Sequence, residues 1–176
     1  MKYAILIAGG FAFFGATASA LDMDQFRAEL ADLDGDWTGV LEYRDYRSNE
    51  RVQIPHDRTL NTAPDGSYQL TRMAFTDPGY QVYSAEIATF DGDTVSLAYA
   101  GNGEASVSQI TLTAFEVTPT GWRAELTGNG IDAGELVEMR FVYELDGGAL
   151  TADKSVRASD QEPFEFRNAI RVSRSN

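Results

Sequence analysis

The chain has 176 residues, of which 14 are basic and 27 acidic, so its formal net charge at pH 7 is −13. This acidic excess argues against a nucleic-acid partner, because phosphate backbones attract basic surfaces. The sequence has no cysteine. We therefore expect neither disulfides nor a cysteine-linked lipid, and stability must come from burial of apolar side chains.

Residues 1–20 have the features of a cleavable secretory signal peptide. Lys2 supplies the positive start, residues 4–17 are uncharged and mostly apolar, and Ala18-Ser19-Ala20 offers the small residues that signal peptidase requires. The apolar run is shorter than the ~20 residues needed to cross a bilayer. We expect cleavage before Leu21, a periplasmic or secreted location in a bacterial envelope, and no transmembrane segment in the mature chain.

One helix is predicted, over residues 22–33. Phe26, Leu30 and Leu33 recur at helical spacing on one face. Asp22 is a suitable N-cap, with Gln25 three residues further on.

Everything after Gly35 alternates between apolar and polar residues with a period of two, which predicts strands. Turn residues such as Asp91-Gly92 and Gly147-Gly148 separate them, and a loop is expected at 128–134. The expected strands are 37–46, 51–60, 67–75, 80–90, 94–99, 105–117, 122–127, 135–145, 149–157 and 164–172.

Short connections make strands that are adjacent in sequence antiparallel neighbours. Such a meander has two exposed edges unless it closes, so a barrel is favoured. The predicted fold is all-β: an antiparallel up-and-down barrel of 8–10 strands, preceded by a short N-terminal helix. Residues 21–176 are expected to form this single domain.

An outer-membrane barrel is the alternative, since alternation alone does not say which face is inside. Such barrels typically end in an aromatic residue, whereas this chain ends in Arg174-Ser175-Asn176. The predicted helix and the heavily charged polar faces favour a soluble barrel with an apolar interior.

Gly35-Asp36-Trp37 follows the predicted helix directly and begins the first strand. This segment resembles the G-x-W signature of lipocalins and the wider calycin superfamily. The resemblance implies that Trp37 lies across the closed end of a barrel, with an arginine near the end of the last strand packed over it. Arg171 is the best match, with Arg167 and Arg174 as alternatives. The lipocalin disulfide is missing, because the chain has no cysteine.

No residue pattern identifies a catalytic centre, a metal site or a cofactor site. His56 is the only histidine, and no Gly-x-Ser-x-Gly motif accompanies it. We expect His56 at the surface or at a cavity rim, and an enzymatic role is not favoured. If catalysis occurs, His56 and Arg72 are the first residues to consider. The acidic segment 32–36 does not match the calcium-binding loop of an EF-hand.

Alternation places a set of large side chains on one interior face. Most belong to the core, but a barrel of this size can also enclose a ligand. The candidate cavity residues are Tyr43, Trp122, Met139, Phe141, Tyr143 and Phe166. Two hypotheses follow: an exported protein that binds a small apolar ligand in its barrel, or an envelope interaction module with a filled barrel.

Overall fold

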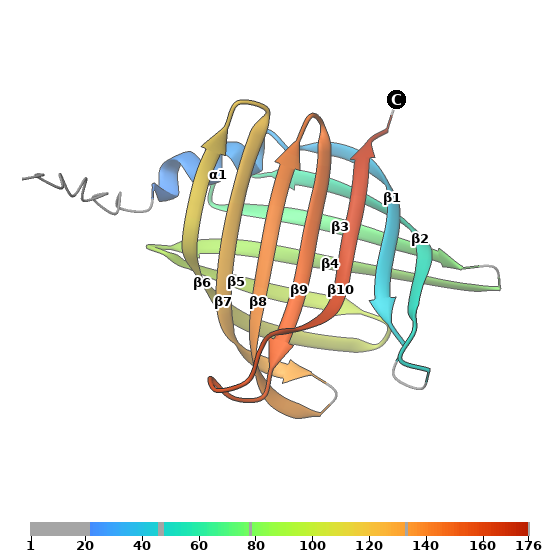
Figure 1. Cartoon of the computed structure of the whole chain (residues 1–176). Coiled ribbons are helices and arrows are strands. Elements are labelled where there is room, and N and C mark those ends of the chain that lie inside the picture. Colours follow the sequence, from blue (N-terminus) through green and yellow to red (C-terminus); the bar gives the residue numbers. More distant parts are fainter. Residues whose placement is uncertain (1–21, 46–47, 78, 133, 176) are drawn as a thin grey trace, which may run out of the picture.

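The computed structural model describes residues 22–45, 48–77, 79–132 and 134–175. The predicted signal peptide, residues 1–20, lies outside these ranges. The described residues form one helix followed by ten strands (Figure 1). The elements are α1 Met23–Ala31, β1 Gly35–Arg44, β2 Arg51–Thr62, β3 Tyr68–Asp77, β4 Tyr80–Asp91, β5 Thr94–Gly101, β6 Glu104–Thr118, β7 Gly121–Asp132, β8 Glu135–Asp146, β9 Ala149–Arg157 and β10 Glu165–Arg174.

The strands form a closed antiparallel barrel in which each strand pairs with its neighbours in sequence. Closure comes from β1 and β10, whose register places Trp37 opposite Arg174 and Leu41 opposite Ile170. At this seam Gly39 leaves no space for a side chain, since a Cβ there would meet the backbone of Arg171 and Val172. The predicted up-and-down barrel is confirmed.

Alternation along each strand builds the core. In β7, Trp122, Ala124 and Leu126 are almost fully buried while their neighbours are partly exposed. Paired positive-φ residues make tight hairpins, as at Gly147-Gly148, where both backbones are left-handed. The prediction of a loop over residues 128–134 is wrong for most of that range. Strand β7 continues to Asp132, which pairs with Glu135 at the start of β8.

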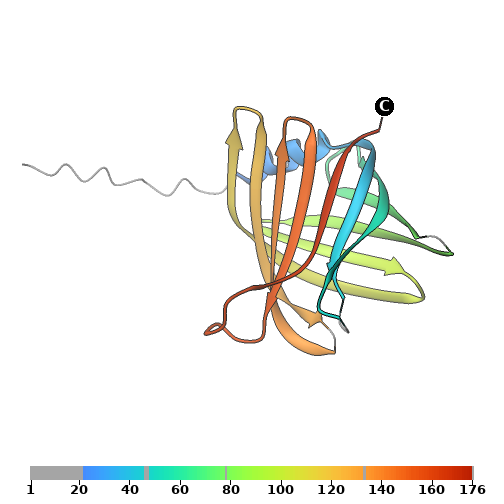
Figure 2. The same cartoon turned by 45° about the vertical axis from the view of Figure 1, so that its right-hand side comes forward.

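Helix α1 lies across one end of the barrel, beside the hairpins that join β6 to β7 and β8 to β9 (Figure 2). The predicted cap is present, with the Gln25 amide donating to the Asp22 carboxylate over 2.9 Å. The helix is shorter than expected and ends at Ala31. Phe26 and Leu33 are buried and Leu30 packs against the same core, as the helical spacing predicted. No helix in the described part of the chain is long and apolar enough to cross a membrane.

Hydrogen bonds fasten the helix end of the chain to the barrel. The Trp37 indole N–H donates to the Leu33 carbonyl over 2.8 Å. The Gln69 side chain donates to the Leu30 carbonyl over 2.7 Å, and the Asp34 carboxylate accepts from the backbone N–H of Thr62 over 2.9 Å. We call this the closed end of the barrel, and the interior below it the lumen.

Candidate functional site

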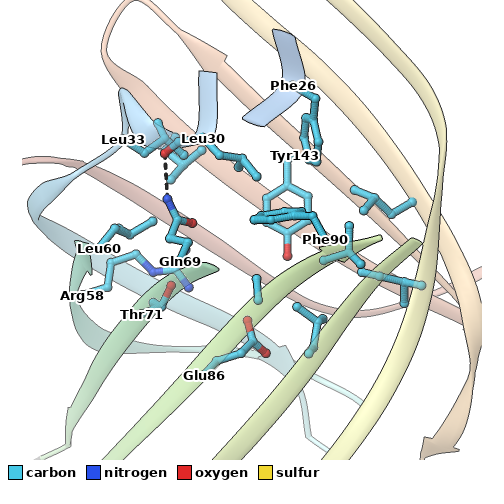
Figure 3. A pocket seen from close by; sticks show the side chains of 16 residues that line it. Phe26, Leu30, Leu33, Arg58, Leu60, Gln69, Thr71, Glu86, Phe90 and Tyr143 are labelled. Carbon is cyan, nitrogen blue, oxygen red and sulfur yellow. Dashed lines mark hydrogen bonds between the residues drawn. The ribbon is translucent and has the colours of Figure 1, made fainter. Parts of the chain in front are cut away.

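A cavity of about 60 Å³ lies in the lumen directly below α1 (Figure 3). Its wall is mostly apolar and comes from the helix and from strands all around the barrel. The lining residues are Phe26, Leu30, Leu33, Arg58, Leu60, Gln69, Thr71, Glu86, Ala88, Phe90, Val95, Leu97, Ile110, Leu126, Tyr143 and Leu150. A single water needs roughly 10–15 Å³ by this measure. The cavity therefore accommodates a compound of only a few heavy atoms.

Three polar side chains, Arg58, Glu86 and Tyr143, line the side of this cavity that faces away from α1. They point into the lumen from β2, β4 and β8 (Figure 3). Arg58 shares its inward parity with Leu60, and Glu86 shares its parity with Ala88. Each lies one inward position further from the closed end than its apolar neighbour. The cavity thus has a mostly apolar end under the helix, where Gln69 donates to the Leu30 carbonyl, and a more polar side below it.

Arg58 has no ion-pair partner among the described residues, since no carboxylate oxygen lies within 4.0 Å of its guanidinium. Its Nη2 reaches only the Met73 sulfur, at 3.8 Å, and its Nε is buried without an acceptor. Burial lowers the pKa of this guanidinium, but an arginine keeps its charge in proteins. A charge enclosed by protein without a partner is costly, so Arg58 is poised to bind an anion or a strong acceptor.

The pKa values of Glu86 and Tyr143 are both raised by burial. Burial raises the pKa of the Glu86 carboxyl, and the Arg58 charge opposes that rise. Burial, reinforced by the Glu86 charge, raises the pKa of Tyr143 to about 12. A protonated carboxyl and a phenol are both hydrogen-bond donors. The guanidinium and the phenol therefore present donors to this side of the cavity, and Glu86 adds a further donor when its carboxyl is protonated.

His56 does not lie at the surface or at a rim, so that expectation is wrong. The side chain is fully buried on the inward face of β2 and stacks on Phe75, with ring centroids 4.5 Å apart. Its Nδ1 lies 3.2 Å from the Ala74 carbonyl, and because a carbonyl only accepts, Nδ1 carries the proton. Nε2 is therefore a buried lone pair without a partner. Burial, helped by the Arg58 charge, lowers the pKa of His56 to about 4.

Of the six predicted cavity residues, Tyr143 lines the cavity. Trp122 is fully buried beside Phe26, with ring centroids 6.3 Å apart. Met139 is buried next to Gly130, and Phe141 packs against the core cluster. These residues face inward but fill the lumen rather than line a space.

The other two predicted cavity residues are at the far end of the barrel. Tyr43 is half-buried near the end of β1. Phe166 lies on the outer side, with the Arg51 guanidinium 3.9 Å above its ring. A register shift between Phe166 and Asn168 interrupts the alternation of β10. Because of this irregularity the Phe166 side chain points outward, whereas strict alternation predicted that it would point into the barrel.

The arginine over Trp37 is Arg174, not Arg171. The Arg174 guanidinium lies 4.7 Å from the indole centroid and donates to the carbonyls of Asp34 and Asp32. Arg171 lies on the outer face of the barrel and forms an ion pair with Asp153 at 3.1 Å. The reason is the register, which places Arg174 opposite Trp37.

Sequence reasoning missed Arg58, Glu86 and the burial of His56 with its Nε2 unpartnered. A signal was present, because Arg58 alternates with Leu60 and Glu86 alternates with Ala88 and Phe90 at strand positions that face inward. Arg72, the other residue considered for catalysis, is exposed on the outer face of β3, and the adjacent Met73 has the inward parity of Gln69 and Thr71.

Two wider depressions, of about 340 and 280 Å³, lie at the end of the barrel opposite α1. Their principal charges neutralise one another. Asp132 accepts from Lys154 at 3.2 Å and from Arg167 at 2.9 Å, and Glu165 pairs with Arg44 at 2.9 Å. The cations that line these depressions are therefore paired with carboxylates, unlike Arg58 below α1.

Comparisons with known proteins bear on the fold. No protein-family model matches this sequence, and no curated protein sequence matches it significantly. The structure is similar to the crystal structure of Rv2717c from M. tuberculosis, with a TM-score of 0.62 and 16% sequence identity. The similarity covers 85% of this chain and 96% of that one. At this identity the likeness is one of fold, a ten-stranded barrel, and leaves the site to be argued from its own residues.

Proposed function

We propose that this protein binds a small, mainly apolar molecule in the cavity below α1. The observation that carries the proposal is a partly enclosed space in the lumen with a predominantly apolar wall and a few polar groups. Small-molecule sites typically have this composition, since apolar surface supplies affinity and a few polar groups fix orientation.

The cavity volume sets the size of the ligand. About 60 Å³ corresponds to roughly four to six water-sized positions. A long-chain lipid or a large pigment does not fit this space. The proposal is therefore narrower than a general carrier of apolar compounds.

The location of this activity belongs to the same proposal. The signal-peptide features of residues 1–20 support binding outside the cytoplasm, in the periplasm or in the medium.

A cavity-filling substitution tests the proposal. Ala88 lines the cavity from β4, so Ala88→Leu should occupy part of the space and weaken binding of a small apolar probe such as 1-butanol by about tenfold or more. Ala98→Leu is the matched control, since Ala98 is exposed on the outer face of the adjacent β5. Binding is measured by calorimetry or ligand-detected NMR on the purified protein. Equal binding by both variants, or none by the unmodified protein, would overturn the proposal.

A second candidate is an interaction module that uses the outside of the barrel. Leu70, Ile87, Ala98 and Val107 form one cross-strand row over β3 to β6, and Val107 is 75% exposed. Tyr83, 66% exposed, lies beside this row on β4. Contiguous exposed apolar surface of this kind is a feature of interaction sites. Val107→Lys would abolish recovery of a crosslinked partner if this face binds one, and would leave small-molecule binding intact.

A further inference from the structure

The polar side of the cavity carries information about the ligand beyond its size. A wall made only of apolar groups would accept any compound of suitable volume. Here Arg58 brings a positive charge to the cavity, its Nε is buried without an acceptor, and no carboxylate lies within 4.0 Å among the described residues. The cations of the opposite end are different, because Lys154, Arg167 and Arg44 are each paired with a carboxylate.

We propose that the ligand is a short-chain monocarboxylate whose carboxylate is bound by Arg58 while its alkyl chain occupies the apolar cavity below α1. This inference rests on the proposed function and specifies the ligand class. A guanidinium and a carboxylate match in charge and in planar geometry, which permits two parallel hydrogen bonds. The carboxylate would also give the buried Nε or a neighbouring nitrogen the acceptor that the protein does not supply.

The orientation of the bound acid follows from the order of the side chains along the barrel axis. Leu60 and Ala88 are nearer the closed end than Arg58 and Glu86 on the same strands. Phe26 and Leu30 of α1, with Leu33 just after the helix, close the space above. The alkyl chain is directed toward the helix and the carboxylate away from it. The cavity volume of about 60 Å³ limits the acid to about four to six carbons.

Glu86 is the group that could oppose an anionic ligand, and its surroundings reduce that opposition. Burial raises the pKa of its carboxyl, and the protonated form donates a hydrogen bond instead of repelling. Tyr143 faces the same space from β8 and is also a donor (Figure 3). Glu86→Gln removes the charge and keeps a donor, so this variant should bind a short carboxylate at least as tightly as the unmodified protein does.

The test compares a carboxylate with its neutral amide, using the purified protein and calorimetry. Valerate should bind about tenfold or more tightly than valeramide, because a hydrogen bond to a charged group discriminates by at least that factor. Arg58→Met should abolish this preference while still binding valeramide. Arg72→Met is the matched control, because Arg72 lies on the adjacent strand, faces outward, and should leave the preference intact.

The outcomes separate this inference from the proposed function. If valeramide binds as tightly as valerate, or if Arg58→Met keeps the preference, the cavity binds small molecules but the carboxylate assignment is wrong. If valerate, valeramide and 1-butanol all fail to bind, the proposed function is wrong, and the assignment of a carboxylate ligand is wrong as well. The comparison of valerate with valeramide on the unmodified protein decides the ligand class even if Arg58→Met fails to fold.

Discussion

Two polar side chains on the inward face of β2 set the chemistry of the lumen. His56 and Arg58 share a face with Leu60, and His56 is fully buried while Arg58 is partly buried. Burying such groups without partners destabilises a fold. Because most of the side chains around the cavity are apolar, the presence of these polar groups in the lumen is an argument for a binding role. His56 differs from Arg58 because it can lose its charge and remain neutral.

The buried imidazole predicts a pH dependence of stability. The pKa of His56 is about 4 in the folded protein, lowered chiefly by burial, against ~6.5 in an unfolded chain. The unfolded state therefore binds more protons between these values, and stability falls as the pH drops from about 6.5 to 4. The contribution of this group is roughly 3 kcal/mol.

Chemical unfolding at pH 7.5 and pH 4.5 measures this effect. His56→Gln, whose side chain does not titrate, should lose less stability across this range than the unmodified protein by about 2–3 kcal/mol. Equal losses in the two proteins would show that His56 is not buried in its neutral form.

Helix α1 is held to the barrel by contacts at its C-terminal end and by the residues that follow it. The Arg174 guanidinium spans this junction, because it covers the Trp37 indole and donates to carbonyls in the segment between the helix and β1. Phe26 and Leu30 of the helix, with Leu33 just after it, in turn line the cavity on the side of the closed end. Anchoring of α1 and the shape of the cavity are therefore coupled.

Two arginine variants distinguish this junction from the outer surface. Arg174→Ala should lower the free energy of unfolding by about 1–2 kcal/mol, since it removes a cation–π contact and two hydrogen bonds. Arg171→Ala removes an ion pair that is 40% and 45% exposed at its two side chains, and should cost less than about 1 kcal/mol. Urea unfolding of both variants measures the difference. If Arg171→Ala lowered the free energy of unfolding more than Arg174→Ala does, Arg171 rather than Arg174 would be the arginine that stabilises the junction.

Closure of the barrel makes every strand an interior strand. The pairing of β1 with β10 continues over seven residue pairs, from Trp37 opposite Arg174 to Tyr43 opposite Asn168. A closed sheet has no free edge to fray or to recruit another chain. The acidic net charge of −13 adds repulsion between copies.

Amide hydrogen exchange tests closure in solution. The paired amides of β1 and β10 should exchange about as slowly as those of β7 and β8, because opening the seam requires breaking the sheet rather than fraying an edge. Exchange along β1 and β10 that is faster by about a hundredfold or more would indicate an open sheet with two edge strands. The short β3–β4 turn at Gly79 serves as a fast-exchanging reference.

The sequence by itself determined the architecture. Period-two alternation, short turns with glycine at left-handed positions, and a capped amphipathic segment are local signals, and the structure confirms the barrel and the helix on which they agree. The sequence-based predictions of element bounds fail where a local signal, such as closely spaced glycines, competes with hydrogen bonding to a neighbouring strand. The glycines of residues 128–134 suggested a loop, but the long β8 partner extends β7 through them.

Only the tertiary structure decided which inward residues surround a space and which fill it. Alternation predicted that Trp122, Met139 and Tyr143 all face inward, yet only Tyr143 among them lines the cavity. The choice of Arg174 over Arg171 likewise depends on the register of β1 against β10, strands separated by almost the whole chain. Register and packing are properties of contacts between distant segments, so alternation within one strand does not contain them. The partnerless state of Arg58 is known for the same reason only once the barrel is closed around it.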